Sequence, residues 1–119
     1  MKVKGLSWLG TYTERFQETV KFYQEVFGLE PRFLADEVVI FQLENGDRVE
    51  VFGPSETDHA WMKAPEAGFL VDDVESARAE MEAAGVEFIG PIHVAGSQNW
   101  SHFKGPDGHI YEITAKRTE

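Results

Sequence analysis

The sequence predicts an α+β protein built from two tandem βαβββ modules, and two observations lead to this prediction. The stretch FQLENGDRVEVF at residues 41–52 recurs in chemical outline as FKGPDGHIYEIT at residues 103–114, with Glu50 aligned on Glu112. Each copy contains an Asn-Gly or Asp-Gly dipeptide, which supplies the positive φ values that tight hairpin turns require. In each half of the chain, a strand, a helical apolar stripe and further strand sequence precede the repeated hairpin.

Module one is expected over about residues 3–54. An apolar strand is predicted at Leu6–Tyr12, and Thr13 is a suitable N-cap for the helix that follows. The helix is indicated by an apolar stripe that Gly28 ends, made of Phe16, Val20, Tyr23 and Phe27. Three short strands are then predicted, at Arg32–Ala35, Val38–Leu43 and Arg48–Phe52.

A connector over residues 55–65 leads to module two, which is expected over about residues 66–115. Ala67–Val71 is predicted as a strand, and Asp72 with Glu75 resembles an acidic capping box at a helix start. The second helical stripe, ended by Gly85, consists of Val74, Ala77, Met81 and Ala84. The remaining strands are predicted at Val86–Ile89, Ile92–Ala95, Trp100–Lys104 and Ile110–Thr114.

Composition limits the function classes. The 119 residues are expected to form a single domain, residues 1–119. A net charge of −10 opposes binding to nucleic acid and to anionic membranes. The absence of cysteine excludes disulfides, a thiolate nucleophile and cysteine metal ligands. No signal peptide or membrane span is indicated, so a cytoplasmic protein is expected.

Three local motifs carry a resemblance to a known family over about residues 3–115. They are VKFYQEVFGL at residues 20–29, VDDV at 71–74 followed by AAGV at 83–86, and GPDGHIYE at 105–112. In this order and spacing they resemble the vicinal oxygen chelate superfamily, which includes glyoxalase I, methylmalonyl-CoA epimerase, extradiol dioxygenases and bleomycin-binding proteins. The resemblance implies that the two modules form a cupped, mixed sheet around a cavity, and that the chain forms a homodimer.

The resemblance also implies four positions for metal ligands, which fall here at Trp8, Glu50, Glu66 and Glu112. An indole offers a metal no lone pair, so the set is incomplete. Two inward carboxylates need a cation, a basic partner or a shared proton. Two interpretations follow. Glu50 and Glu112, with Glu66 and one histidine, hold a divalent ion; or Arg48 or hydrogen bonds neutralise them while Trp8 fills the metal's space.

Trp100 and His102 alternate along one strand and therefore share a face. If Phe103 packs away from the cavity, both line it near Glu112, where His102 and Glu112 are the candidate catalytic residues. His102 is then either a general base, a ligand or a hydrogen-bonded wall residue. The substrate-pocket candidates are Trp8, Arg48, Phe52, Trp100 and His102.

The other aromatic and histidine side chains have simpler interpretations. His59 and Trp61 lie in the connector as exposed loop residues, or as a lid or dimer contact. His93 and His109 are expected at the surface. The aromatic rings expected in the core or the cavity wall are those of Tyr12, Phe41 and Phe52.

Two functions follow from the sequence. The first is a small-molecule-binding member of the superfamily without an obligatory metal, acting as a sequestering module or as an enzyme of unknown substrate. The alternative is a metal-dependent lyase or isomerase resembling glyoxalase, with Glu50 and Glu112 as ligands. A divalent metal ion is the one cofactor considered, and a purely structural or protein-binding role is a third class. The expected partners are a small organic ligand and a second copy of the chain.

Overall fold

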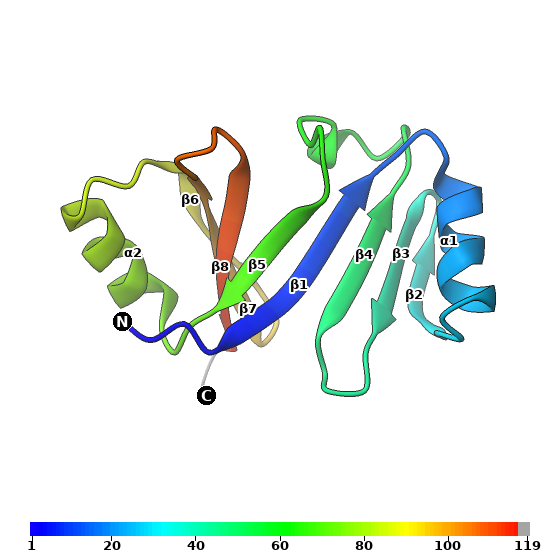
Figure 1. Ribbon diagram of the computed structural model, residues 1–119, viewed down its shortest axis with the longest axis horizontal. Coiled ribbons are helices and arrows are strands. Elements are labelled where there is room, and N and C mark those ends of the chain that lie inside the picture. The colour runs from blue at the N-terminus through cyan, green and yellow to red at the C-terminus, as the bar shows by residue number, and fades with distance from the viewer. Residues whose placement is uncertain (117–119) are drawn as a thin grey trace. The chain divides into compact units, whose positions relative to one another are not determined.

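The structure is a computed structural model that describes residues 1–116, and its strands and helices occur in the order βαβββ-βαβββ (Figure 1). The chain divides into two compact units, one formed by Trp8–Glu66 and the other by Met1–Ser7 together with the residues from Ala67 on. The first seven residues therefore group with module two. The predicted α+β class and the two tandem βαβββ modules are confirmed.

Module one is a four-stranded sheet with one helix. Its elements are β1 (Gly5–Tyr12), α1 (Phe16–Glu25), β2 (Pro31–Ala35), β3 (Val38–Gln42) and β4 (Arg48–Phe52). The strand order is β2-β3-β4-β1, with β1 parallel to β4 and the other neighbours antiparallel. The apolar stripe of α1 packs on a buried cluster from β3 and β4, made of Val39, Phe41, Val49 and Val51. Phe41 is therefore a core residue beneath α1, which excludes it as a wall of a cavity on the opposite face.

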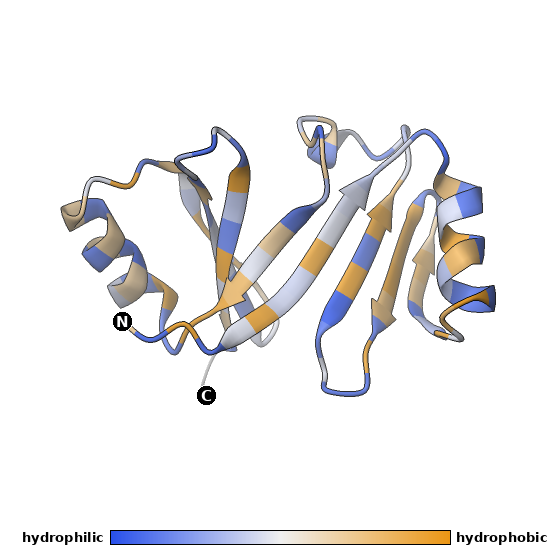
Figure 2. Cartoon of the chain, in the orientation of Figure 1, coloured by the Kyte–Doolittle hydropathy of each residue, from blue (hydrophilic) through white to orange (hydrophobic). Residues whose placement is uncertain are grey.

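Module two repeats this arrangement. Its elements are β5 (Glu66–Leu70), α2 (Val74–Ala83), β6 (Phe88–Ala95), β7 (Gln98–Lys104) and β8 (Ile110–Lys116). The strand order is β5-β8-β7-β6, with β5 parallel to β8. Its core joins the start of α2 to β8 through Val71, Val74, Ala77, Ile113 and Ala115. In both modules the last strand alternates between residues facing the helix and residues facing away, which Figure 2 shows as hydrophobic and hydrophilic bands along β4.

The two repeated turns have the same hydrogen bonds. The amides of Asp47 and His109 donate to the side chains of Asn45 and Asp107, each at 3.0 Å. The turn glycines have φ values of +92° and +85°, but Asn45 and Asp107 do not have positive φ. Each dipeptide therefore supplies positive φ through its glycine, and the residue before the glycine supplies the hydrogen-bond acceptor.

Both predicted helix starts are displaced by one or two residues. Arg15 is the N-cap of α1 without a side-chain bond, and the hydroxyl of Thr13 accepts from the Arg15 amide at 3.0 Å, before the helix begins. In α2 the N-cap is Asp73, whose carboxylate accepts from the Ser76 amide, whereas Asp72 pairs with Lys4 on the surface. A one-residue shift decides which carboxylate points at the free amides of the first turn.

The strand boundaries differ from the prediction mainly at β6. The two predicted strands Val86–Ile89 and Ile92–Ala95 are one strand, with an irregular register between Ile89 and His93 where Gly90 has a φ of +73°. The connector contains a short 3-10 helix, η1 (Thr57–His59). Among residues 1–116, no helix is long and apolar enough to cross a lipid bilayer.

Candidate functional site

Each module has one sheet face that its helix does not cover, and the predicted site residues lie on these two faces. In β4, Val49 and Val51 face α1, so the side chains of Arg48, Glu50 and Phe52 point to the other face. We call this side the polar face of module one. The polar face of module two is defined in the same way by Trp100, His102 and Glu112, because Ile113, Ala115 and Phe103 pack on the α2 side. Phe103 packs on the α2 side of the sheet, so its side chain lies on the opposite face from His102.

On module one, Trp8 is held directly against Glu50. The indole nitrogen Nε1 of Trp8 donates to Oε1 of Glu50 at 2.9 Å. The indole ring lies over Gly10, because a Cβ built on Gly10 would stand 2.1 Å from Cη2 of Trp8. Gly10 is itself the parallel register partner of Glu50. A glycine at this position is therefore what lets the indole lie flat on β1 and reach the carboxylate.

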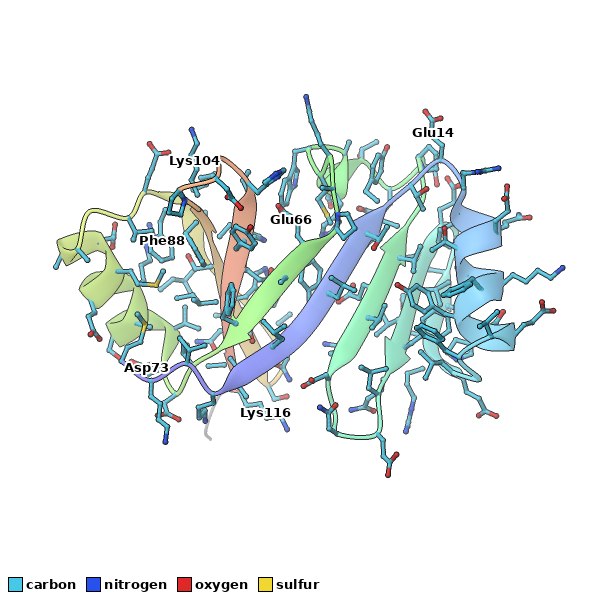
Figure 3. The ribbon with its side chains drawn as sticks, viewed as in Figure 1. Glu14, Glu66, Asp73, Phe88, Lys104 and Lys116 are labelled. Atoms are coloured by element: carbon cyan, nitrogen blue, oxygen red, sulfur yellow. The ribbon has the colours of Figure 1, made fainter. Side chains whose placement is uncertain are left out.

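The same register recurs on module two with different chemistry. Gly68 is the parallel partner of Glu112, and a Cβ on Gly68 would stand 3.0 Å from Cγ of Glu112. Trp8 and Glu66 each lie two residues before these glycines, so they occupy equivalent positions in the two modules. Glu66, at the start of β5 in Figure 3, is 7% exposed. The strand register thus supports the predicted equivalence of Trp8 with Glu66 and of Glu50 with Glu112.

The carboxylate of module two has a histidine partner. Oε2 of Glu112 lies 3.1 Å from Nε2 of His102, and Glu112 is 6% exposed. The buried carboxylate orients the imidazole through this contact. His102 and Glu112, predicted as candidate catalytic residues, are therefore brought together by adjacent antiparallel strands.

His93 belongs to the same cluster, and this position of His93 was not predicted from the sequence. Its ring stacks on Trp100 with centroids 5.6 Å apart, and it meets His102 edge-on at 5.7 Å. Burial lowers the pKa of His93 below its usual value, and the neighbouring His102 lowers it further. His93 is partly exposed and its ring packs on this cluster, which the expected surface position did not include, whereas His109 is exposed as predicted. Pairing the predicted strands around Gly96 would have placed His93 opposite Trp100.

Arg48 does not neutralise Glu50. Within residues 1–116, the guanidinium of Arg48 forms no ion pair with that carboxylate, so the ion pair expected between them is absent. Glu50 is satisfied by the indole of Trp8, in agreement with the interpretation in which hydrogen bonds stabilise the carboxylate. Arg48 keeps its place on the polar face of module one, opposite Trp8 in the register.

The connector covers part of the same face. The ring of His59 stacks on Phe52 with centroids 3.8 Å apart and planes at 6°, and Nδ1 of His59 lies 2.5 Å from Glu56. His59 is therefore packed on module one and is not an exposed loop residue, whereas Trp61 is 38% exposed and donates to the carbonyl of Asp58. Phe52 is 2% exposed, so a ligand can contact its ring only if η1 moves.

The residues of module one do not fit a metal ion. A divalent cation needs several oxygen or nitrogen ligands, and Glu50 has beside it an N–H donor with no lone pair. Within either module, residues 1–116 contain no group of three or more His, Cys, Asp or Glu side chains placed to hold a metal ion. Module two offers two such groups in contact, Glu112 and His102.

The comparison with protein families identifies the chain. Residues 5–113 match the Glyoxalase/Bleomycin resistance protein/Dioxygenase superfamily. The chain belongs to this superfamily. The resemblance to vicinal oxygen chelate proteins predicted from the three motifs is thereby confirmed. None of the curated proteins compared with the chain matches it.

Solved structures share the fold at low sequence identity. A methylmalonyl-CoA epimerase from Streptomyces coelicolor, in complex with 2-nitronate-propionyl-CoA, has a TM-score of 0.71 at 16% identity, with 98% of this chain and 100% of that chain covered. A superfamily member from Vibrio splendidus has a TM-score of 0.66 at 19% identity, with 97% and 100% covered. An Mn(II)-bound glyoxalase from Novosphingobium aromaticivorans has a TM-score of 0.75 at 18% identity, and this chain covers 42% of it while 99% of this chain is matched. These similarities establish the fold and do not establish an activity.

Proposed function

We propose that this superfamily member binds a small, planar or amphipathic organic molecule without needing a metal ion. The observation that carries the proposal is the Trp8 indole, which lies over Gly10 and donates to Glu50 at the position where metal-dependent relatives are expected to place a ligand. An indole there replaces a coordinating group with a flat apolar surface and one N–H donor. Such a surface favours stacking of a planar ligand.

The polar face of module two carries groups of its own that suit recognition and proton transfer. Trp100 offers an aromatic surface there, and the imidazole of His102 is oriented by Glu112 at 3.1 Å. When Nε2 of His102 carries the proton donated to Glu112, Nδ1 is the basic nitrogen of the ring. His102 then accepts a proton from, or donates one to, a bound ligand, and the carboxylate of Glu112 stabilises the protonated ring.

A tryptophan fluorescence screen against planar organic compounds, with and without a chelator, tests this function. We expect at least one compound class to change the emission, with equal affinity in both conditions. His102→Gln should weaken binding of a proton-donating ligand, and His109→Gln, at an exposed turn position, is the matched control. Loss of binding on chelation would show that the proposal is wrong.

The alternative function is a metal-dependent lyase or isomerase resembling glyoxalase, with Glu50 and Glu112 as ligands. The observation that favours it is the identical glycine–glutamate register of the two modules, which places one carboxylate at the equivalent position in each. The Trp8–Glu50 hydrogen bond weighs against it. Elemental analysis after incubation with Mg²⁺, Mn²⁺, Fe²⁺, Ni²⁺ and Zn²⁺ separates the two functions, because a bound ion lost in Glu112→Ala supports the alternative.

A further inference from the structure

Module two contains a cavity on the side of its sheet that faces α2. The cavity has a volume of about 360 Å³ and is lined by apolar groups from β5, α2, β7, β8 and the N-terminal segment. Phe69, Phe103 and Ile113 line it, and in β7 and β8 these residues alternate with those of the polar face. The cavity therefore lies on the opposite face of the sheet from His102 and Glu112.

Three aromatic rings form the wall of this cavity. The ring centroids of Phe69, Phe103 and Tyr111 lie 6.5, 6.1 and 5.9 Å apart in pairs. The hydroxyl of Tyr111 is bonded to Asp107 at 2.5 Å, and this bond lowers the pKa of Asp107 below its usual value. The polar end of Tyr111 is thus held at the β7–β8 turn, and its ring is the part that borders the cavity.

The mouth of the cavity is formed by the N-terminal segment. Val3 lines it and is 52% exposed. The amide of Lys4 donates to the carbonyl of Leu70 at 2.8 Å, and the Lys4 ammonium pairs with Asp72. These two contacts hold the segment along the end of β5, so that Val3 and Met81 of α2 border the same space.

We propose that this cavity binds an uncharged aromatic molecule, at a site distinct from the polar faces. The lining gives a charged or hydrogen-bonding ligand no partner, and burying such a group without a partner is costly. The volume lies at the lower end of the range for small-molecule sites, which is about 300–1,000 Å³, and is too small for a strand or helix of another protein. The three rings provide flat surfaces for offset or edge-on contacts with an aromatic occupant.

Toluene titration of the full chain, followed by the methyl resonances of Val3, Met81 and Ile113, tests this site. We expect saturable shifts confined to these methyl groups, and a higher melting temperature that follows from binding to the folded state. Benzoate, which adds a carboxylate to the same ring, should produce neither effect. Equal binding of benzoate, or tighter binding of cyclohexane than of toluene, would overturn the proposed ligand class.

Two substitutions in the same exposed segment make a matched pair. Val3→Trp should fill the mouth and weaken toluene binding by tenfold or more, while Leu6→Trp, at a residue that is 56% exposed and does not line the cavity, should leave it unchanged. Met81→Trp, from the helix side, gives a second filling variant if Val3→Trp does not fold. Toluene binding that persists in a folded variant with a filled cavity would overturn the proposal. A toluene affinity that falls as the protein concentration rises would also overturn it, because it would show that a second copy of the chain covers the site. Glu112→Gln should leave toluene binding intact, so failure of the proposed function and failure of this site are distinguishable.

Discussion

Substituting Gly10 by alanine tests the contact on which the proposed function depends. The added Cβ would stand 2.1 Å from Cη2 and 2.3 Å from Cζ2 of Trp8, where separations below 3.0 Å essentially never occur. The φ of Gly10 is not in the positive region, so alanine fits the backbone and the conflict lies with the indole alone. Because the indole is rigid and its far edge makes the contact, it must move off Gly10 and away from Glu50.

The size of the effect follows from the lost hydrogen bond and the overlap. A hydrogen bond to a charged group contributes about 1.5–3 kcal/mol, and the partial exposure of this pair favours the lower end. Overpacking adds roughly 1 kcal/mol or more, and the smaller chain entropy of alanine returns about 0.5 kcal/mol. We expect Gly10→Ala to lower the free energy of unfolding by about 2 kcal/mol, or roughly 8 °C in the melting temperature.

A double-mutant cycle with Trp8→Ala isolates the mechanism. Without the indole nothing conflicts with the new methyl group, so Gly10→Ala in that background should be neutral or stabilising. Urea unfolding measures the four free energies, and the Trp8 indole N–H resonance reports the hydrogen bond directly. Equal costs of Gly10→Ala in both backgrounds would refute the reasoning.

Three further predictions concern module two. Arg78→Ala should lower the free energy of unfolding in urea by about 2 kcal/mol, because the Arg78 guanidinium donates to the carbonyl of Gly90 and to the fully buried hydroxyl of Ser101. The control Arg15→Ala, at an exposed residue, should lower it by no more than about 0.5 kcal/mol, and equal losses in the two variants would contradict this role of Arg78. Asp73→Ala should lower the melting temperature because it removes the N-cap of α2, whereas Asp72→Ala should not. A larger loss in Asp72→Ala would instead support the predicted capping box at Asp72. In NMR titration, His93 should show a pKa below its usual value of 6.5, because burial and the neighbouring His102 oppose its protonation. The unfolded chain then binds this proton more readily than the folded chain, so the free energy of unfolding should fall as the pH drops through about 6.5. A raised pKa of His93 would contradict this packing.

The elements and the paired glutamates could be predicted from the sequence because they depend on local patterns. The alternation of β4 and β8 fixes which face Glu50 and Glu112 share with their neighbours, and the repeated turn glycines fix where each hairpin reverses. The prediction that Trp8 and Glu50 belong to one site depended on the family resemblance, and in the structure the Trp8 indole contacts Glu50.

The contacts that decide the chemistry could not be predicted in the same way. The indole of Trp8 reaches Glu50 only because Gly10 lacks a side chain, which depends on the rotamer and not on the alternation. Phe41 was assigned to either the core or a cavity wall, and the packing of α1 resolves the choice in favour of the core. His93 was assigned to the surface because β6 was divided in two, which concealed its pairing with Trp100.

We propose that an indole takes the place of a metal ligand beside Glu50. The most direct test is a titration of the protein with Mn²⁺ and Zn²⁺ in which the Trp8 indole N–H resonance and the bound metal are measured together. We expect the resonance to stay unchanged and no stoichiometric ion to be retained. One ion retained per chain, with loss of the indole resonance and abolished by Glu112→Ala, would contradict it.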